Sequence, residues 1–118
     1  MKTSKIADLT ALQLDWAVAK CEGFEAAFTT NKEVMILREG VTDYFDPHRN
    51  WGWSGPIIER ENISVGYQGH LGVPLDSLWY ATNRRGACGF GQTPLVAALR
   101  CYVASKLGDE VEIPEELL

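Results

Sequence analysis

Two segments of the chain carry the side chains best suited to binding a charged, planar ligand. The first, Tyr44–Arg60, combines aromatic rings with arginines, which stack on rings and pair with carboxylates or phosphates. Its prolines and glycines would hold the backbone in one shape. The candidate ligand-binding residues of this segment are Tyr44, Arg49, Trp51, Trp53 and Arg60. The alternative is that its tryptophans are core anchors that pin a long loop, because aromatic residues dominate cores as well as sites.

The second segment, Asn83–Thr93, is rich in glycine and comes directly before a predicted helix. Glycines let the backbone approach a ligand, and a helix N-terminus offers free N–H groups to an anion. An arginine pair adds charge-assisted hydrogen bonds. The candidate ligand-binding residues here are Asn83, Arg84, Arg85, Gly89, Gly91 and Thr93. The phosphate-loop pattern G-x-x-x-x-G-K-[ST] is absent, and the alternative is a flexible connection with solvated arginines.

Side chains for catalysis or for metal binding are poorly arranged in this sequence. The nearest approach to a metal site is Asp43, Asp46 and His48, a single histidine with two acids in one loop. There is no G-x-S-x-G pattern for nucleophilic catalysis. Glu59 and Glu61 are two positions apart, so a helix would direct them away from each other. We therefore expect no catalytic residue, no metal and no cofactor, and no enzymatic activity.

The charge of the chain is concentrated at its C-terminal end. The five acids of residues 109–118 account for the net charge of −5, because residues 1–108 carry eleven acids and eleven bases. A neutral body argues against a broad DNA or RNA footprint, which needs clustered excess Lys and Arg. With 118 residues we expect one domain, 1–118, with a short acidic tail, 109–118, that aids solubility.

The three cysteines indicate a reducing compartment. Their number is odd, no C-x-x-C pair occurs, and no apolar run resembles a secretory signal or a membrane span. Cys21 and Cys101 fall on predicted helices and are expected to be small core residues. We therefore expect a cytoplasmic protein with idle thiols.

Two strong helices, Thr10–Glu22 and Thr93–Leu107, must position these segments. The second can be capped by Thr93, has Pro94 at its first position, and can end at Gly108. The first has capping-box spacing at its start. Both carry apolar or small residues on two faces, which predicts cover on both sides. The surplus suggests a homodimer or a larger homo-oligomer.

The remaining elements are expected to be short. Lys2–Ala7 is a strand or an arm, and Phe24–Phe28 with Glu33–Arg38 reads as a hairpin. The other predicted elements are an irregular aromatic loop (Gly40–Trp53), a short helix (Pro56–Glu61), two strands (Ile63–Gln68 and Ser77–Thr82) and a glycine-rich loop (Asn83–Gln92). The predicted fold class is α+β, with two main helices packed on a small, mostly antiparallel sheet and a long irregular aromatic loop.

Three segments resemble one family in order and spacing: LDWAVAKCEG (Leu14–Gly23), NWGWSGPIIERENI (Asn50–Ile63) and GQTPLVAALRCYVASKLGDEVEIPEEL (Gly91–Leu117). Together they resemble the NinX-like proteins of lambdoid-type bacteriophages over nearly the whole chain. The resemblance implies a small accessory phage protein of unknown function, expressed in the host cytoplasm. It supplies no catalytic residues.

Three functional hypotheses follow. The first is a phage-encoded, non-enzymatic binding module that binds a host or phage protein in the infected host cytoplasm, for which the acidic tail could meet a basic partner. The alternative is an anti-defence protein that sequesters an anionic small molecule, such as a nucleotide-type signal. An enzyme is the third hypothesis. We expect no membrane association and no nucleic-acid partner.

Overall fold

The computed structural model describes all 118 residues, which form helices and short antiparallel sheets. The three α-helices are α1 (Ala11–Glu22), α2 (Trp51–Arg60) and α3 (Pro94–Leu107). The strands are β1 (Lys2–Lys5), β2 (Glu25–Phe28), β3 (Val34–Arg38), β4 (Val41–Tyr44), β5 (Ser64–Tyr67), β6 (Trp79–Thr82), β7 (Cys88–Gly91) and β8 (Glu110–Ile113). The predicted α+β class is confirmed, although the strands form three separate sheets, β1-β8, β2-β3-β4 and β5-β6-β7.

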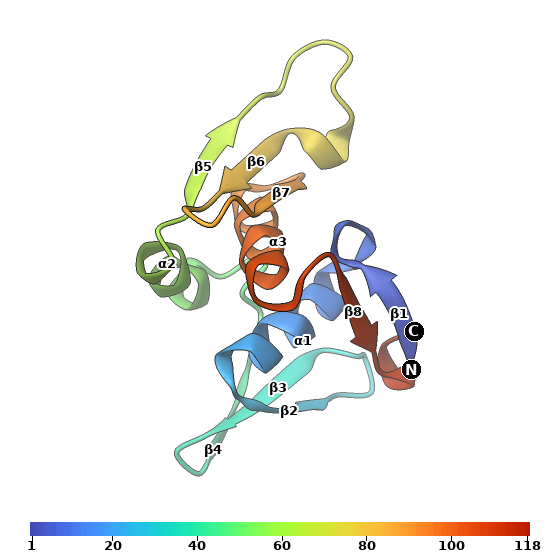
Figure 1. Cartoon of the computed structure of the whole chain (residues 1–118). Helices are drawn as coiled ribbons and strands as arrows, with labels where there is room; N and C mark the ends of the chain where they lie inside the picture. The colour runs from blue at the N-terminus through green and yellow to red at the C-terminus, as the bar shows by residue number, and fades with distance from the viewer.

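The two main helices are stacked between two of the sheets (Figure 1). The sheet β5-β6-β7 lies on α3, α3 lies on α1, and α1 lies on the hairpin β2-β3. Helix α2 flanks α3 on one side and the β1-β8 ribbon flanks the stack on the other. The molecule is elongated, with extents of 44 × 28 × 22 Å. None of its helices combines the length and the apolar character needed to span a bilayer.

Local sequence signals set the ends of both main helices. The Thr10 hydroxyl accepts from the Gln13 N–H, and the Gln13 side chain accepts in return, which completes the predicted capping box. In α3 the Thr93 hydroxyl accepts from the Val96 N–H at 3.2 Å. Gly23 follows α1 with a φ of +78°, a left-handed conformation that a side chain would oppose.

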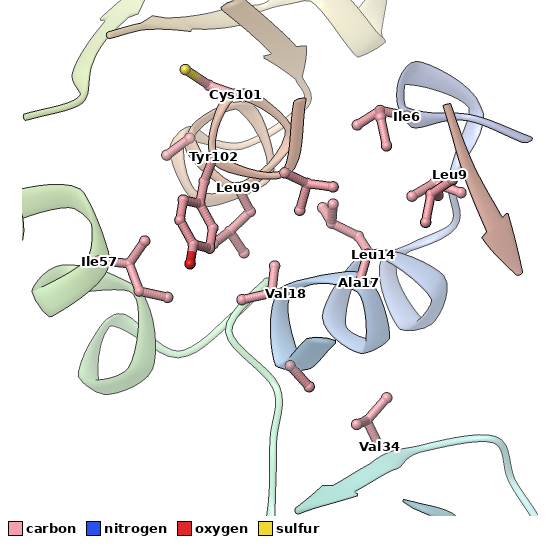
Figure 2. Packing of buried hydrophobic residues seen from close by; sticks show 14 of the residues in the cluster. Ile6, Leu9, Leu14, Ala17, Val18, Val34, Ile57, Leu99, Cys101 and Tyr102 are labelled. Atoms are coloured by element: carbon pink, nitrogen blue, oxygen red, sulfur yellow. The ribbon is translucent and has the colours of Figure 1, made fainter. Parts of the chain in front are cut away.

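The core runs between the helices and reaches α2 (Figure 2). Leu99 and Tyr102 of α3 point toward α1 and α2, where they meet Val18 and Ile57. The opposite, small-residue side of α3 is covered by β7. Both faces of α3 are therefore covered within one chain. The surplus face of α3, from which a homo-oligomer was predicted, is therefore not free to contact a second copy. The homo-oligomer stays a prediction.

The predicted irregular loop 40–53 and the predicted helix start at Pro56 are wrong. Strand β4 lies in that loop, and α2 begins at Trp51, five residues before Pro56. The Asn50 side chain caps the helix by accepting from the Gly52 N–H at 2.9 Å. Pro56 therefore lies inside the helix, where it removes one backbone hydrogen bond without ending it.

The acidic tail is folded against the body of the protein. Strand β8 pairs with β1 in the register Lys2↔Ile113, and Ile113 and Leu117 are buried. The acids of the strand alternate with these apolar residues and stay exposed. This alternation has the period of a half-buried strand, which the prediction of a solubilising tail overlooked.

Candidate functional site

The predicted glycine-rich loop 83–92 is wrong in its second half, because residues 88–91 form β7. A Cβ placed on Gly89 would lie 2.4 Å from the Ala97 carbonyl oxygen and 2.5 Å from the Cys101 nitrogen. A Cβ on Gly91 would lie 2.9 Å from the Ala97 nitrogen. These two glycines therefore let β7 lie directly on α3. Their predicted role of approaching a ligand is replaced by packing.

The polar residues at the ends of this segment are engaged with backbone. The Asn83 side-chain oxygen accepts from the N–H groups of Arg85 and Ala87, at 3.0 and 3.1 Å. Asn83 thereby closes the turn between β6 and β7. Thr93 caps α3, so its hydroxyl is also committed. In the β6–β7 turn, the side chains of Arg84 and Arg85 are exposed to solvent.

Arg84 and Arg85 lie at a hollow of about 280 Å³ that has no apolar residue in its lining. Its residues come from the end of α2, the β6–β7 turn and the end of α3: Arg60, Glu61, Asn62, Asn83, Arg84, Arg85 and Lys106. We call it the basic hollow. Four cationic side chains and one carboxylate line it. Neither arginine of the turn takes part in an ion pair of the protein.

Arg60, by contrast, is already bound to carboxylates. Its guanidinium donates to both oxygens of Glu22, at 3.2 and 2.6 Å, and to Glu61 at 3.0 Å. The hydroxyl of Tyr102 donates to Glu22 at 2.5 Å. Burial and this hydrogen bond raise the pKa of Tyr102, so the phenol stays protonated. Lys106 completes the network with a contact of 3.3 Å to Glu61. The network joins the C-terminal ends of all three helices.

A second polar hollow, of about 460 Å³, continues from the first along the sheet. The two share Asn62, Asn83 and Arg84. The hydroxyl residues Ser64 and Thr82, which are paired across β5 and β6, line the second hollow and are exposed. The pair of hollows thus offers cationic, amide and hydroxyl donors in one continuous depression.

The aromatic residues of the first predicted segment, Tyr44–Arg60, lie away from both hollows. Trp53 packs against Phe45, with ring centroids 5.0 Å apart, and Arg38 lies over its ring. This arrangement matches the alternative of a core anchor. Trp51 and Tyr44 are exposed but line none of the principal hollows.

Arg49 is also remote from the basic hollow and is bound to Asp46 at 2.9 Å. Trp51 and Arg60 stand at opposite ends of α2, about 14 Å apart along its axis. Of the residues predicted in Tyr44–Arg60, only Arg60 therefore joins those of the turn.

One buried pair, Asp15 and His48, was not predicted from the sequence. Asp15 lies on α1 with no solvent exposure, and its carboxylate accepts from the His48 N–H at 3.0 Å and contacts His48 Nδ1 at 2.5 Å. Burial raises the pKa of Asp15, against the lowering effect of the His48 hydrogen bonds. His48 is thus held by α1 and not by the acids next to it in sequence. No signal in the sequence links residues 33 positions apart.

This pair anchors the segment before α2. The nearby Ser54 hydroxyl donates to the Pro47 carbonyl at 2.5 Å, so it is engaged in holding the same turn. The half-buried and buried thiols are also inert, because burial raises the pKa of Cys21 and of Cys101 to about 11. Cys88, for which no burial was predicted, is exposed.

The comparison with protein families agrees with the resemblance seen in the sequence. A family model described as "Bacteriophage P22, NinX" matches residues 5–106. The match includes α1, α2, all of α3 except its last residue, the turn with Arg84 and Arg85, and the Asp15–His48 pair. A comparison with curated proteins gave no significant match. The chain belongs to the bacteriophage P22 NinX family.

Proposed function

We propose that this phage accessory protein is a non-enzymatic binding module of the infected host cytoplasm that holds an anionic, phosphate-bearing small molecule in the basic hollow. The observation that carries the proposal is the pair Arg84 and Arg85. Both are exposed at the hollow without a carboxylate partner. Guanidinium groups bind phosphate oxygens through paired, charge-assisted hydrogen bonds.

The surroundings of the arginine pair support this proposal. Asn83 fixes the turn by two hydrogen bonds to backbone N–H groups, so the arginines start from an ordered backbone. Glu61 is the one carboxylate of the lining, and its charge is directed to Arg60 and Lys106. A turn whose backbone is already ordered loses less entropy when an anion binds. The unneutralised charge of its two arginines attracts that anion. The proposal includes no catalytic step, because the hollow is lined by no nucleophile with an adjacent base.

Isothermal titration of the full chain with pyrophosphate tests the proposal. We expect saturable binding that weakens as salt rises, since the attraction is electrostatic. Arg84→Ala and Arg85→Ala should each weaken binding about tenfold, the loss that removal of one charge-assisted pair of hydrogen bonds predicts. Arg49→Ala is the matched control, because Arg49 is exposed, bound to Asp46 and outside the hollow. Equal losses in the control and in the turn variants would contradict the proposal.

Binding of a host or phage protein is the second candidate function. It is favoured by the segment between β5 and β6, where Leu71 is 100% exposed and Leu75 is 69% exposed. Exposed apolar side chains mark a protein contact when they are grouped, and these two leucines lie four positions apart in one connecting segment. A pull-down from infected cells with the wild type and with Leu71→Ser/Leu75→Ser tests this function. A partner recovered equally by both would contradict a role of these leucines.

A further inference from the structure

We infer that the anion held in the basic hollow is the phosphate of a free nucleotide, whose base stacks on Tyr80. The inference rests on the proposed anion site and adds an aromatic subsite on the outer face of the sheet β5-β6-β7. It assigns a base to a surface that the aromatic residues of Tyr44–Arg60 do not reach.

The outer face of this sheet is defined by the alternation of β6. Ala81 is buried against α3, so its neighbours Tyr80 and Thr82 point to the other side. The register pairs Tyr80 with Gly66 and Thr82 with Ser64. The α-helix that packs on this sheet, α3, lies on the opposite side (Figure 1). These two cross-strand pairs, which we call the Tyr80 row and the Ser64–Thr82 row, therefore form one open surface.

The ring of Tyr80 lies on the backbone of β5 at Gly66. A Cβ placed on Gly66 would lie 2.5 Å from both Cζ and the hydroxyl oxygen of Tyr80, and 2.7 Å from Cε1. Glycine at this position therefore lets the ring cross the neighbouring strand in close contact. Tyr80 is nevertheless 38% exposed, so part of its side chain stays open to solvent. A ring supported by a strand and partly open to solvent is the kind of surface on which single bases stack.

The spacing between the ring and the charge suits a nucleotide. The row Ser64–Thr82 follows the Tyr80 row at about 7 Å, two residues along the strand. Arg84 comes next in the turn and lines the same 460 Å³ hollow as Ser64 and Thr82. In a nucleotide, a pentose with hydroxyl groups separates the base from the phosphate. The surface offers an aromatic ring, then two hydroxyls, then arginines, in the same order.

Titrations of the full chain with the four common nucleoside diphosphates and with pyrophosphate test the inference. We expect at least one nucleoside diphosphate to bind about tenfold more tightly than pyrophosphate, because base stacking adds to the phosphate contacts. Tyr80→Leu should remove this advantage and leave pyrophosphate binding unchanged. Tyr80→Phe keeps the ring and should keep the advantage. Tyr44→Leu is the control, because Tyr44 is an exposed tyrosine on β4, in another sheet.

A second variant keeps the test decisive if Tyr80→Leu loses its fold. Gly66→Ala places a Cβ against the Tyr80 ring and lifts it from the strand, at a site where the neighbour is the far end of a side chain. It should reduce nucleotide binding toward the pyrophosphate level. Unchanged nucleotide binding in a folded Gly66→Ala or Tyr80→Leu protein would overturn the stacking role.

The outcomes separate this inference from the proposed function. If pyrophosphate binds and depends on Arg84, but no nucleoside diphosphate binds more tightly, the nucleotide inference is wrong and the anion site stands. If neither pyrophosphate nor any nucleotide binds, the anion site itself is wrong. A single-stranded tetranucleotide that binds more tightly than every mononucleotide would place the base in a polymer and overturn the assignment to a free nucleotide.

Discussion

The two segments that resemble ligand sites in the sequence differ in how much of their positive charge is neutralised within the protein. In Tyr44–Arg60, Arg49 is bound to Asp46 and Arg60 is bound to two glutamates. In the β6–β7 turn, Arg84 and Arg85 have no carboxylate partner. An arginine therefore indicates an anion-binding site only when the fold leaves its charge without a carboxylate partner. The guanidinium of Arg60 is instead used in ion pairs that join the ends of the helices.

The segments also differ in what their glycines do. Gly55 of α2 has open space where a Cβ would stand, whereas Gly89 of β7 faces the backbone of α3 at 2.4 Å. Gly89 and Gly91 of the second segment are therefore part of the core contact that positions the turn. Substitutions confined to one segment at a time test these differences.

The largest effect is expected for Gly89→Ala. The new Cβ would meet the Ala97 carbonyl and the Cys101 nitrogen, both backbone atoms of α3 that cannot move separately. Strand and helix must separate, and we expect the free energy of unfolding to fall by about 3 kcal/mol. Urea titration followed by circular dichroism measures it. Gly55→Ala is the matched control and should stabilise α2 by about 0.5 kcal/mol. Similar losses in both variants would contradict the packing role of Gly89.

A loss of about 2 kcal/mol is expected for Asp15→Ala, because the variant leaves the His48 N–H and Nδ1 without their buried acceptor. Asp15→Asn keeps an oxygen for the N–H and should lose less than about 1 kcal/mol. Chemical unfolding at pH 7 ranks the three proteins. An equal loss in both variants would show that the charge, and not the hydrogen bonds, anchors the segment before α2.

The pH dependence of the same pair has a definite sign. Because burial raises the pKa of Asp15, the folded protein binds this proton more tightly than the unfolded chain does. The contribution of Asp15 to the free energy of unfolding is therefore largest below the ordinary carboxyl pKa of 3.8 and decreases as the pH rises through the raised value. Glu61 acts in the opposite sense. Burial opposes the shift, but hydrogen bonds from Arg60 and Lys106 lower its pKa, so its stabilisation is lost as the pH falls. Asp15→Asn should remove the decrease in stability with rising pH that Asp15 causes. It should leave the loss with falling pH that Glu61 causes.

Much of the fold could be predicted from local patterns in the sequence. The capping residues of α1 and α3, the hairpin β2-β3 and the strands β5 and β6 all follow from spacing within a few residues. Strand β7 was missed because Gly89 and Gly91 alternate with Cys88 and Phe90, and glycine reads as a loop former. The packing role of these two glycines becomes clear only when the position of α3, which they face, is known.

Less of the candidate site could be predicted, because its geometry depends on distant partners. Arg60 has glutamates beside it in the sequence and Arg84 has none, but Glu22, which makes the bidentate contact with Arg60, lies 38 positions away. The stacking surface was missed for a similar reason. Tyr80 is one aromatic residue of a strand, and its value as a platform depends on Gly66 in the neighbouring strand.

A smaller effect, about 1 kcal/mol, is expected for Arg60→Ala. The side chain is half exposed, which screens each ion pair, but it makes a bidentate contact with Glu22 and joins three helix ends. Arg60→Lys keeps the charge without the paired geometry and should lose an intermediate amount. Thermal unfolding at low and high salt measures the electrostatic share. A loss that does not respond to salt would assign the effect to packing on Tyr102.

The smallest effect on stability is expected for Arg84→Ala and Arg85→Ala. Neither side chain has an ion pair to lose, and each lies near other positive charges in the basic hollow. Removal of one charge reduces this repulsion, so the free energy of unfolding should stay equal or rise by less than about 0.5 kcal/mol. The urea titration described for Gly89→Ala, applied to these variants and to Arg60→Ala, detects the contrast. Arginines that contribute nothing to folding keep their guanidinium groups free for an anion. If both variants unfold more easily than Arg60→Ala, the two arginines are structural, and the basic hollow loses the unpaired charge on which the anion site depends.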